Sequence, residues 1–199
     1  MKTKILSLIA LFIITSGISK STYAKTVTTA DYTILKDIRA VNRIEVRGNV
    51  ELFISDDQNE QVKVYNKYYA ESALVQSANG VLRITSYNPE KLVVWVSMND
   101  LRSVSAYDNA EVRSFGKLSK IEFNIDLHNY ATANLNLDAY SANVNVADHA
   151  KADLTGTATE FTLNHDKSTS VNKYNFTAAH YIENKTFIPA PEMDELVGI

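Results

Sequence analysis

Three stretches in the second half of the chain share one pattern, namely Ser-Ala-Tyr-Asp-Asn-Ala-Glu-Val at 105–112, Asp-Leu-His-Asn-Tyr-Ala-Thr-Ala at 126–133 and Asn-Val-Ala-Asp-His-Ala-Lys-Ala at 145–152. Each stretch contains a short alternating run, a polar turn with Asn or Asp, and an alanine that opens the next run. A weaker fourth copy, Asn-His-Asp-Lys-Ser-Thr-Ser-Val, occupies 164–171. Repeats of about 20 residues are typical of stacked chain segments.

The aligned small residues mark the period of this repeat. They are Ala110, Ala131 and Ala150, with Thr169 in the fourth copy, and the intervals between them are 21, 19 and 19 residues. A unit of this length cannot bury a core alone, but copies stacked about 4.8 Å apart pair their strands and share one core. We therefore predict that these four positions lie one above another at a tight bend.

The remaining residues of each repeat fit the same arrangement. Asn and Asp tolerate left-handed backbone and bond to their own turn, so we expect a polar ladder where the turns stack. The wider parts of the core are assigned to Leu135, Leu137, Val144, Val146 and Leu154. A β-sandwich of hairpins stays open as an alternative, because regular turn spacing is also typical of sandwiches.

The first half of the chain also alternates with a period of two, which predicts strands with one buried face. Gly48, within Arg47-Gly48-Asn49, and Asn79-Gly80 are read as hairpin turns. We expect these strands to form an N-terminal portion with antiparallel or mixed pairing. The predicted inward positions include Ile44, Val46, Val50, Leu52, Ile54, Leu82 and Ile84.

The two ends of the chain differ from the middle. Lys2 and Lys4 precede an apolar run over 5–14, and small residues follow at 22 and 24, which is the layout of a secretory signal peptide. An uncleaved N-terminal anchor is the competing interpretation. Two prolines and three acidic residues suggest an irregular tail at the other end. The sequence thus predicts a signal peptide over 1–24, a single domain over 25–187 and an irregular tail over 188–199.

Composition excludes several function classes. The chain has 20 basic and 23 acidic residues, and removal of 1–24 would leave it more acidic. This charge argues against nucleic acid and anionic membranes as partners. The absence of cysteine removes disulfide and thiol chemistry. No other segment is long and apolar enough for a membrane-spanning helix, so we expect no transmembrane segment after cleavage. The predicted signal peptide implies an exported protein of the periplasm or cell surface.

The pattern resembles the putative auto-transporter adhesin head (GIN) domain family, a secreted bacterial domain of unknown function. The repeats after Ser105 resemble the C-terminal half of that family, and the likeness covers roughly 36–185. The resemblance implies an all-β, right-handed parallel-helix-like fold and a periplasmic or surface location. The family often has glycine where this chain has Asn109, Tyr130 and His149. The earlier segments that carry the resemblance are 44–54, 62–64, 80–84, 92–96 and 101–104.

Catalytic and metal motifs are sparse. The sequence has neither Gly-x-Ser-x-Gly nor a phosphate-binding glycine loop, so no catalytic residue and no cofactor is predicted. Asp148-His149 and His165-Asp166 could approach each other if the turns stack, and such pairs can bind divalent metals. Turn chemistry explains both pairs equally well, so no metal site is predicted.

Two functional hypotheses follow. The first is a non-catalytic exported binding or adhesion module whose partner is a cell-envelope glycan or a surface protein. Binding residues are not assigned, although tyrosines at 65, 68, 69 and 87 suit sugar or protein contacts, while Trp95 is expected to pack between layers. The second is a carbohydrate-active enzyme on a β-helix, which needs a pair of carboxylates. Its candidates are Asp108, Asp126, Asp148, Asp153 and Asp166.

Overall fold

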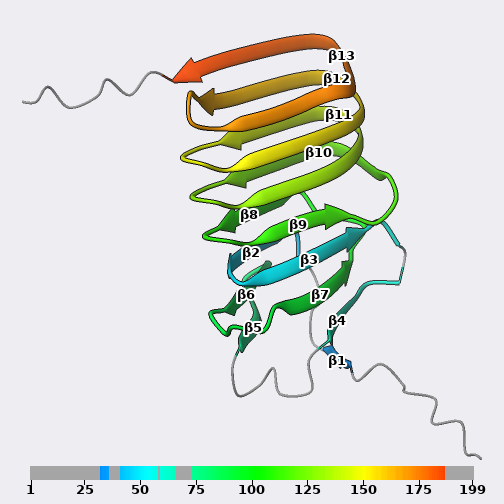
Figure 1. The fold of residues 1–199 in the computed structure, drawn as a ribbon. Coiled ribbons are helices and arrows are strands. Elements are labelled where there is room, and N and C mark those ends of the chain that lie inside the picture. Colours follow the sequence, from blue (N-terminus) through cyan, green and yellow to red (C-terminus); the bar gives the residue numbers. More distant parts are fainter. Residues whose placement is uncertain (1–31, 36–40, 58, 66–72, 187–199) are drawn as a thin grey trace, which may run out of the picture.

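The computed structural model describes residues 32–35, 41–57, 59–65 and 73–186, and these residues form strands and connecting turns without a helix (Figure 1). The predicted signal peptide and tail lie outside them, so the domain boundaries at 24 and 187 stay predictions. The strands are β1 (Thr33–Leu35), β2 (Arg43–Gly48), β3 (Val50–Ser55), β4 (Gln61–Tyr65), β5 (Ala73–Ala78), β6 (Val81–Ser86), β7 (Leu92–Ser97), β8 (Ser103–Tyr107), β9 (Glu111–Ser114), β10 (Leu118–Leu127), β11 (Thr132–Val146), β12 (Lys151–Asp166) and β13 (Ser170–Thr186).

All thirteen strands belong to one sheet that curls into a half-barrel (Figure 1). Arm A of the sheet runs in the order β1-β4-β7-β3-β9, and arm B runs β5-β6-β2-β8-β10. The long strand β11 joins the arms, because its first residues pair with β9 and its last residues pair with β10. Strands β12 and β13 continue the stack above β11. The all-β prediction is confirmed, and the right-handed β-helix implied by the resemblance stays a prediction.

The predicted repeat is confirmed by the strand register. Each residue of β11 pairs in parallel with the residue 19 positions later in β12, as in Thr132 with Lys151. The repeating alanines lie above one another: the N–H of Thr132 donates to the Ala110 carbonyl at 2.9 Å, and the N–H of Lys151 donates to the Ala131 carbonyl at 2.9 Å. Parallel pairing between successive copies argues against a sandwich of hairpins.

The core fills the space between the two arms. Along most of the strands every second residue points inward, as the period of a strand requires, and β10 departs from this pattern at its bend. The five residues assigned to the wider core are all buried, and the three repeating alanines are completely buried. Small side chains at the alanine positions leave room for the chain to turn between arm B and arm A.

The N-terminal portion has mixed pairing, as predicted. The hairpin at Asn79-Gly80 is confirmed, because β5 and β6 pair antiparallel around it and both turn residues have positive φ. The predicted hairpin at Gly48 is wrong. Gly48 has a φ of +82°, but β2 pairs with β6 and β8, whereas β3 pairs with β7 and β9. The turn at Gly48 therefore carries the chain from arm B to arm A.

Replacement of Gly48 tests this crossing. Both Gly48 and Gly116 have φ near +80°, but a Cβ at 48 would overlap the Ser86 carbonyl oxygen, whereas a Cβ at 116 meets open space. We expect Gly116→Ala to lower the free energy of unfolding by about 1 kcal/mol from backbone strain alone. Gly48→Ala should lower it by about 3 kcal/mol, since steric overlap adds to the strain. Urea denaturation of both variants measures the difference, and equal losses would contradict the close approach.

Candidate functional site

The turn residues singled out in the sequence form a ladder along one edge of the stack. Asp108, Asn129 and Asp148 all have φ near +60°. The N–H of Asn129 donates to the Asp148 carboxylate at 2.8 Å, and the N–H of Asp108 donates to the Asn129 side-chain oxygen at 3.2 Å. The ladder is confirmed, with one correction: the side chains of Asn129 and Asp148 accept from the turn below rather than from their own turn. They hold successive turns together.

Asp166 ends this ladder at the last turn. Its carboxylate accepts from the N–H of Asp148 at 2.9 Å and from the N–H of Ser168 at 2.9 Å. Loss of solvation acts to raise the pKa of Asp166, but the hydrogen bonds from Ser168, Asp148 and Thr169 outweigh it, so the pKa lies below its usual value. The ionised form of Asp166 is therefore the form that stabilises the stack.

The five aspartates proposed for catalysis all accept hydrogen bonds from other segments of the fold. Three of them belong to the turn ladder, where Asp108 also accepts from the Tyr87 hydroxyl at 3.0 Å. Asp126 lies on arm B and accepts from Asn145 at 2.6 Å, whereas Asp153 lies on arm A and accepts from Asn172 at 3.2 Å. Each carboxylate thus bonds to a neighbouring segment, and the enzyme hypothesis finds no support.

The two histidine–aspartate pairs lie in adjacent turns, where Asp148 contacts Asp166, but the two histidines have different partners. His149 stacks on Tyr130, with 5.2 Å between ring centroids. His165 instead contacts Glu183 through Nε2 at 2.9 Å. Among residues 32–35, 41–57, 59–65 and 73–186 no cluster of three or more His, Asp or Glu side chains could hold a metal ion.

The lowered pKa of Asp166 predicts how stability depends on pH. A carboxylate whose folded pKa lies below its unfolded value of about 3.9 stabilises the fold above that value, and this contribution is lost as the pH falls through the folded pKa. Asp166→Asn keeps an acceptor oxygen but cannot titrate. We expect the wild type to melt at a higher temperature than Asp166→Asn at pH 6, with the gap closing toward pH 2. A gap that stays constant with pH would refute this role.

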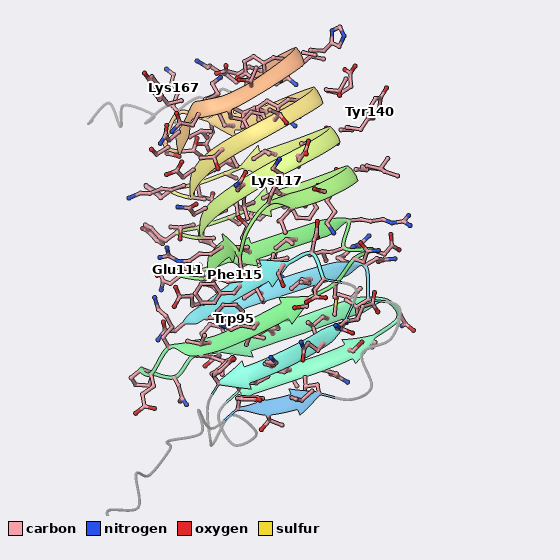
Figure 2. All side chains as sticks on the ribbon, turned by 90° about the vertical axis from the view of Figure 1, so that its right-hand side faces the viewer. Trp95, Glu111, Phe115, Lys117, Tyr140 and Lys167 are labelled. Atoms are coloured by element: carbon pink, nitrogen blue, oxygen red, sulfur yellow. The ribbon has the colours of Figure 1, made fainter. Side chains whose placement is uncertain are left out.

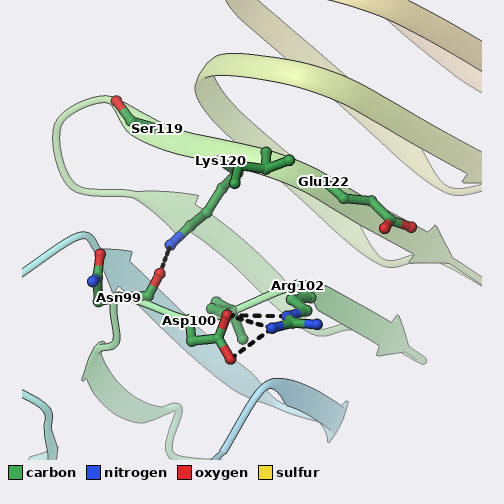
Figure 3. Close-up of a pocket in the computed structure, with 8 residues that line it drawn as sticks. Asn99, Asp100, Arg102, Ser119, Lys120 and Glu122 are labelled. Atoms are coloured by element: carbon green, nitrogen blue, oxygen red, sulfur yellow. Dashed lines mark hydrogen bonds and ion pairs between the residues drawn. The ribbon is translucent and has the colours of Figure 1, made fainter.

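A pocket of about 410 Å³ lies where β10 bends, next to the segment that precedes β8 (Figure 3). Lys120 occupies an inward position there that is alanine in the rungs above, at 139, 158 and 178. Its ammonium group pairs with Asp56 at 2.5 Å and donates to the carbonyl oxygen of Asn99 at 2.7 Å. A buried lysine needs such partners. Lys120 therefore fills the core at the lowest of these bends, and its role is structural.

The aromatic patch on the outer face of arm A is the stronger candidate site. We define it as Tyr32, Phe53, Tyr65, Trp95 and Phe115. Trp95 is at its centre: its ring lies 4.7 Å from that of Phe53 and 4.9 Å from that of Phe115. Figure 2 shows Trp95 and Phe115 side by side on this surface. The patch joins side chains from β3, β4 and β7, from the residue that precedes β1 and from the loop after β9.

The position of Trp95 corrects its predicted location between layers. Trp95 alternates with the buried Val94 and Val96, so it points outward and is covered only in part by its neighbours. Phe115 is 61% exposed, and its N–H donates to the Ile54 carbonyl at 2.7 Å, which fixes the loop beside the patch. Exposed aromatic rings gathered in one place mark an interaction site more often than scattered ones do.

Charged residues next to the patch are paired with one another. Arg113 contacts Glu51 at 2.9 Å and Glu111 at 3.2 Å, and Lys91 contacts Glu111 at 2.5 Å. The hydrogen bond from Lys91 is the main reason why the pKa of Glu111 lies below its usual value. At neutral pH these ion pairs hold their side chains flat along the sheet beside the aromatic patch.

The sequence identified this site only in part. Of the tyrosines predicted to suit contacts, Tyr65 belongs to the patch and Tyr87 lies elsewhere, while Tyr68 and Tyr69 fall outside the described residues. Phe53 alternates with the inward Leu52 and Ile54, so its outward direction was available from the pattern. Its contact with Trp95 depends on the pairing of β3 with β7, some 40 residues apart, for which no local signal exists.

Comparison with known proteins identifies the family. The model for "putative auto-transporter adhesin, head GIN domain" matches residues 40–184. The chain belongs to this family. No curated protein matches the chain. The matched range contains β2 to β12 and most of β13, so the family assignment covers nearly the whole described sheet of this GIN-domain protein.

Solved structures share the fold of this GIN-domain protein. A putative adhesin from Bacteroides fragilis NCTC 9343 superposes with a TM-score of 0.69 at 13% identity, over 78% of this chain and 75% of that one. A putative adhesin from Parabacteroides merdae ATCC 43184 gives 0.62 at 13% identity, over 77% and 76%. A putative lipid binding protein from Parabacteroides distasonis ATCC 8503 gives 0.59 at 11% identity, over 78% of each chain. These TM-scores show a common fold.

The described residues contain no helix of the length and apolar character that crossing a membrane requires.

Proposed function

We propose that this GIN-domain protein is an exported, non-catalytic adhesion module of the cell envelope, with the aromatic patch as its contact surface. Its partner is a cell-envelope glycan or a surface protein. We further propose that the mature chain is a single domain of the parallel β-helix type, delivered to the periplasm or the cell surface by the signal peptide over 1–24. The family assignment and the shared fold support this class of function.

The single observation that carries the proposal is the composition of the patch. Five aromatic rings that are far apart in sequence meet on one outer face, and none of them is needed to fill the core between the arms. Phe115 is held in place by its backbone and still leaves most of its ring exposed. A rigid sheet that presents fixed rings loses little conformational entropy on binding, which favours its use as a contact surface.

The arrangement of acids on the protein supports a binding role over a catalytic one. Asp148 and Asp166 of the turn ladder accept backbone N–H groups, and the acids beside the patch are held in ion pairs. A general acid needs a carboxyl group whose pKa is raised, whereas the resolved shifts for Glu111 and Asp166 are downward.

Loss of the patch should abolish adhesion. In the variant Trp95→Ser/Phe115→Ser we expect retention of the purified chain on cells of its own organism to fall at least tenfold, because the two central rings are removed. Tyr140→Ser is the matched control, since Tyr140 is an equally exposed aromatic on β11, far from the patch (Figure 2). Retention is measured by flow cytometry of labelled protein, with melting curves to confirm folding. Equal retention of both variants would refute the proposal.

A further inference from the structure

The outer face of arm A continues beyond the aromatic patch as a regular array. Strand register aligns one row of side chains across seven strands, from β4 through β7, β3, β9, β11 and β12 to β13. The residues of this row are Lys63, Trp95, Phe53, Arg113, Asn134, Asp153 and Asn172. The row starts at Lys63, is aromatic at Trp95 and Phe53, and is polar from Arg113 upward.

The next outward row follows the same strands. It includes Tyr65 and Glu51 below and Thr132, Lys151 and Ser170 above. Between the two rows, over β9 to β13, lies an open groove of about 330 Å³. Its side chains are amides, hydroxyls, a carboxylate and two cationic groups, which together donate and accept hydrogen bonds at close intervals. We call the patch and this groove together the strip.

The charges in the strip largely neutralise one another. Arg113 and Lys91 pair with Glu51 and Glu111, and in the groove Lys151 and Asp153 contribute one charge of each sign. A surface of this kind offers little to a strongly charged partner, because positive and negative groups are nearly equal in number. Amide and hydroxyl groups instead suit a neutral ligand that is rich in hydroxyl groups.

The shape of the strip distinguishes a glycan from a protein. A protein interface places its apolar residues at the centre and surrounds them with a polar rim. In the strip the aromatic rings lie at one end of a line, and the polar groove extends in one direction only. From β7 to β13 the line crosses five strand spacings, roughly 24 Å. A sugar chain has C–H faces that pack on aromatic rings and hydroxyl groups that bond to short polar side chains.

We infer that the strip binds one extended, neutral polysaccharide chain across the rungs, with sugar rings packed on Trp95, Phe53 and Phe115 and further sugars hydrogen-bonded in the groove. This inference rests on the proposed adhesion function and names the ligand class of the same site. It assigns two roles: the aromatic end supplies apolar contact, whereas Asn134, Asp153 and Asn172 extend the contact to longer chains.

The first experiment asks what the protein recognises on cells. Cells of its own organism are treated either with periodate, which oxidises sugar diols, or with proteinase K. We expect periodate to remove at least nine-tenths of the retention and proteinase K to leave it intact. The opposite result would overturn the glycan inference and leave the adhesion function standing, with a surface protein as the partner. If untreated cells retain nothing, both proposals fail.

The second experiment tests the strip itself. Neutral polysaccharide from the same envelope is hydrolysed and sorted by chain length, and binding is followed through Trp95, the only tryptophan of the chain. We expect the Kd to fall at least tenfold between disaccharides and octasaccharides. Asn134→Ala/Asn172→Ala should remove this gain, whereas Tyr140→Ser should retain it. A Kd that is independent of length, or a gain that survives the double substitution, would overturn the extended site.

Discussion

Parallel backbone pairing between segments 19 residues apart is the constraint on which the rest of this structure depends. Each rung donates its N–H groups to the rung below, and offsets of 21 and then 19 residues bring Ala131 over Ala110 and Ala150 over Ala131. A strand shifted by one residue would move all of its inward side chains to the solvent. The buried alanines and the Asn/Asp ladder both act against such a shift. Only in the native register does each alanine and each ladder residue lie next to the equivalent residue of the next rung.

The same offset creates the outer surface. Because the register repeats, side chains that point to the same face align across neighbouring strands, and chemically similar residues form rows. On arm B this produces bonds between asparagines, such as Asn164 to Asn145 at 2.6 Å. On arm A it places the polar groove of the upper rungs directly in line with the aromatic patch of β3 and β7. The proposed binding function thus uses a by-product of the stacking that gives the fold its stability.

Much of this fold could be predicted from the sequence, because its main signals are local and periodic. Alternation identified the inward residues of most strands, and the alanine spacing identified the stack. The hairpin expected at Gly48 was wrong, since a glycine with positive φ marks a change of direction but not which strands then pair. Lys120 was missed for a related reason: the bend of β10 at Ile121 and Glu122 interrupts the alternation and turns a lysine inward.

The candidate site was harder to predict than the fold. Aromatic residues in the first half of the chain suggested contacts, but the patch exists only because arm A brings β4, β7 and β3 together with the loop after β9. Phe115 lies in that loop, where no alternating pattern indicates whether a side chain points inward or outward. Long-range pairing of this kind is a property of the whole sheet. The pattern of a single strand can therefore identify an outward residue of the site but not the residues that it contacts.

Disulfide cross-linking tests the stacking most directly, because the chain contains no cysteine of its own. Asn143 and Thr162 are register partners on β11 and β12, whereas Asn164 is two residues further along. Partners in adjacent strands lie about 4.8 Å apart, within the range of a disulfide, and the offset pair is separated by roughly 8 Å. We predict that Asn143→Cys/Thr162→Cys oxidises to an intramolecular disulfide and that Asn143→Cys/Asn164→Cys does not. Cross-linking of the offset pair, with none in the register pair, would contradict the 19-residue stack.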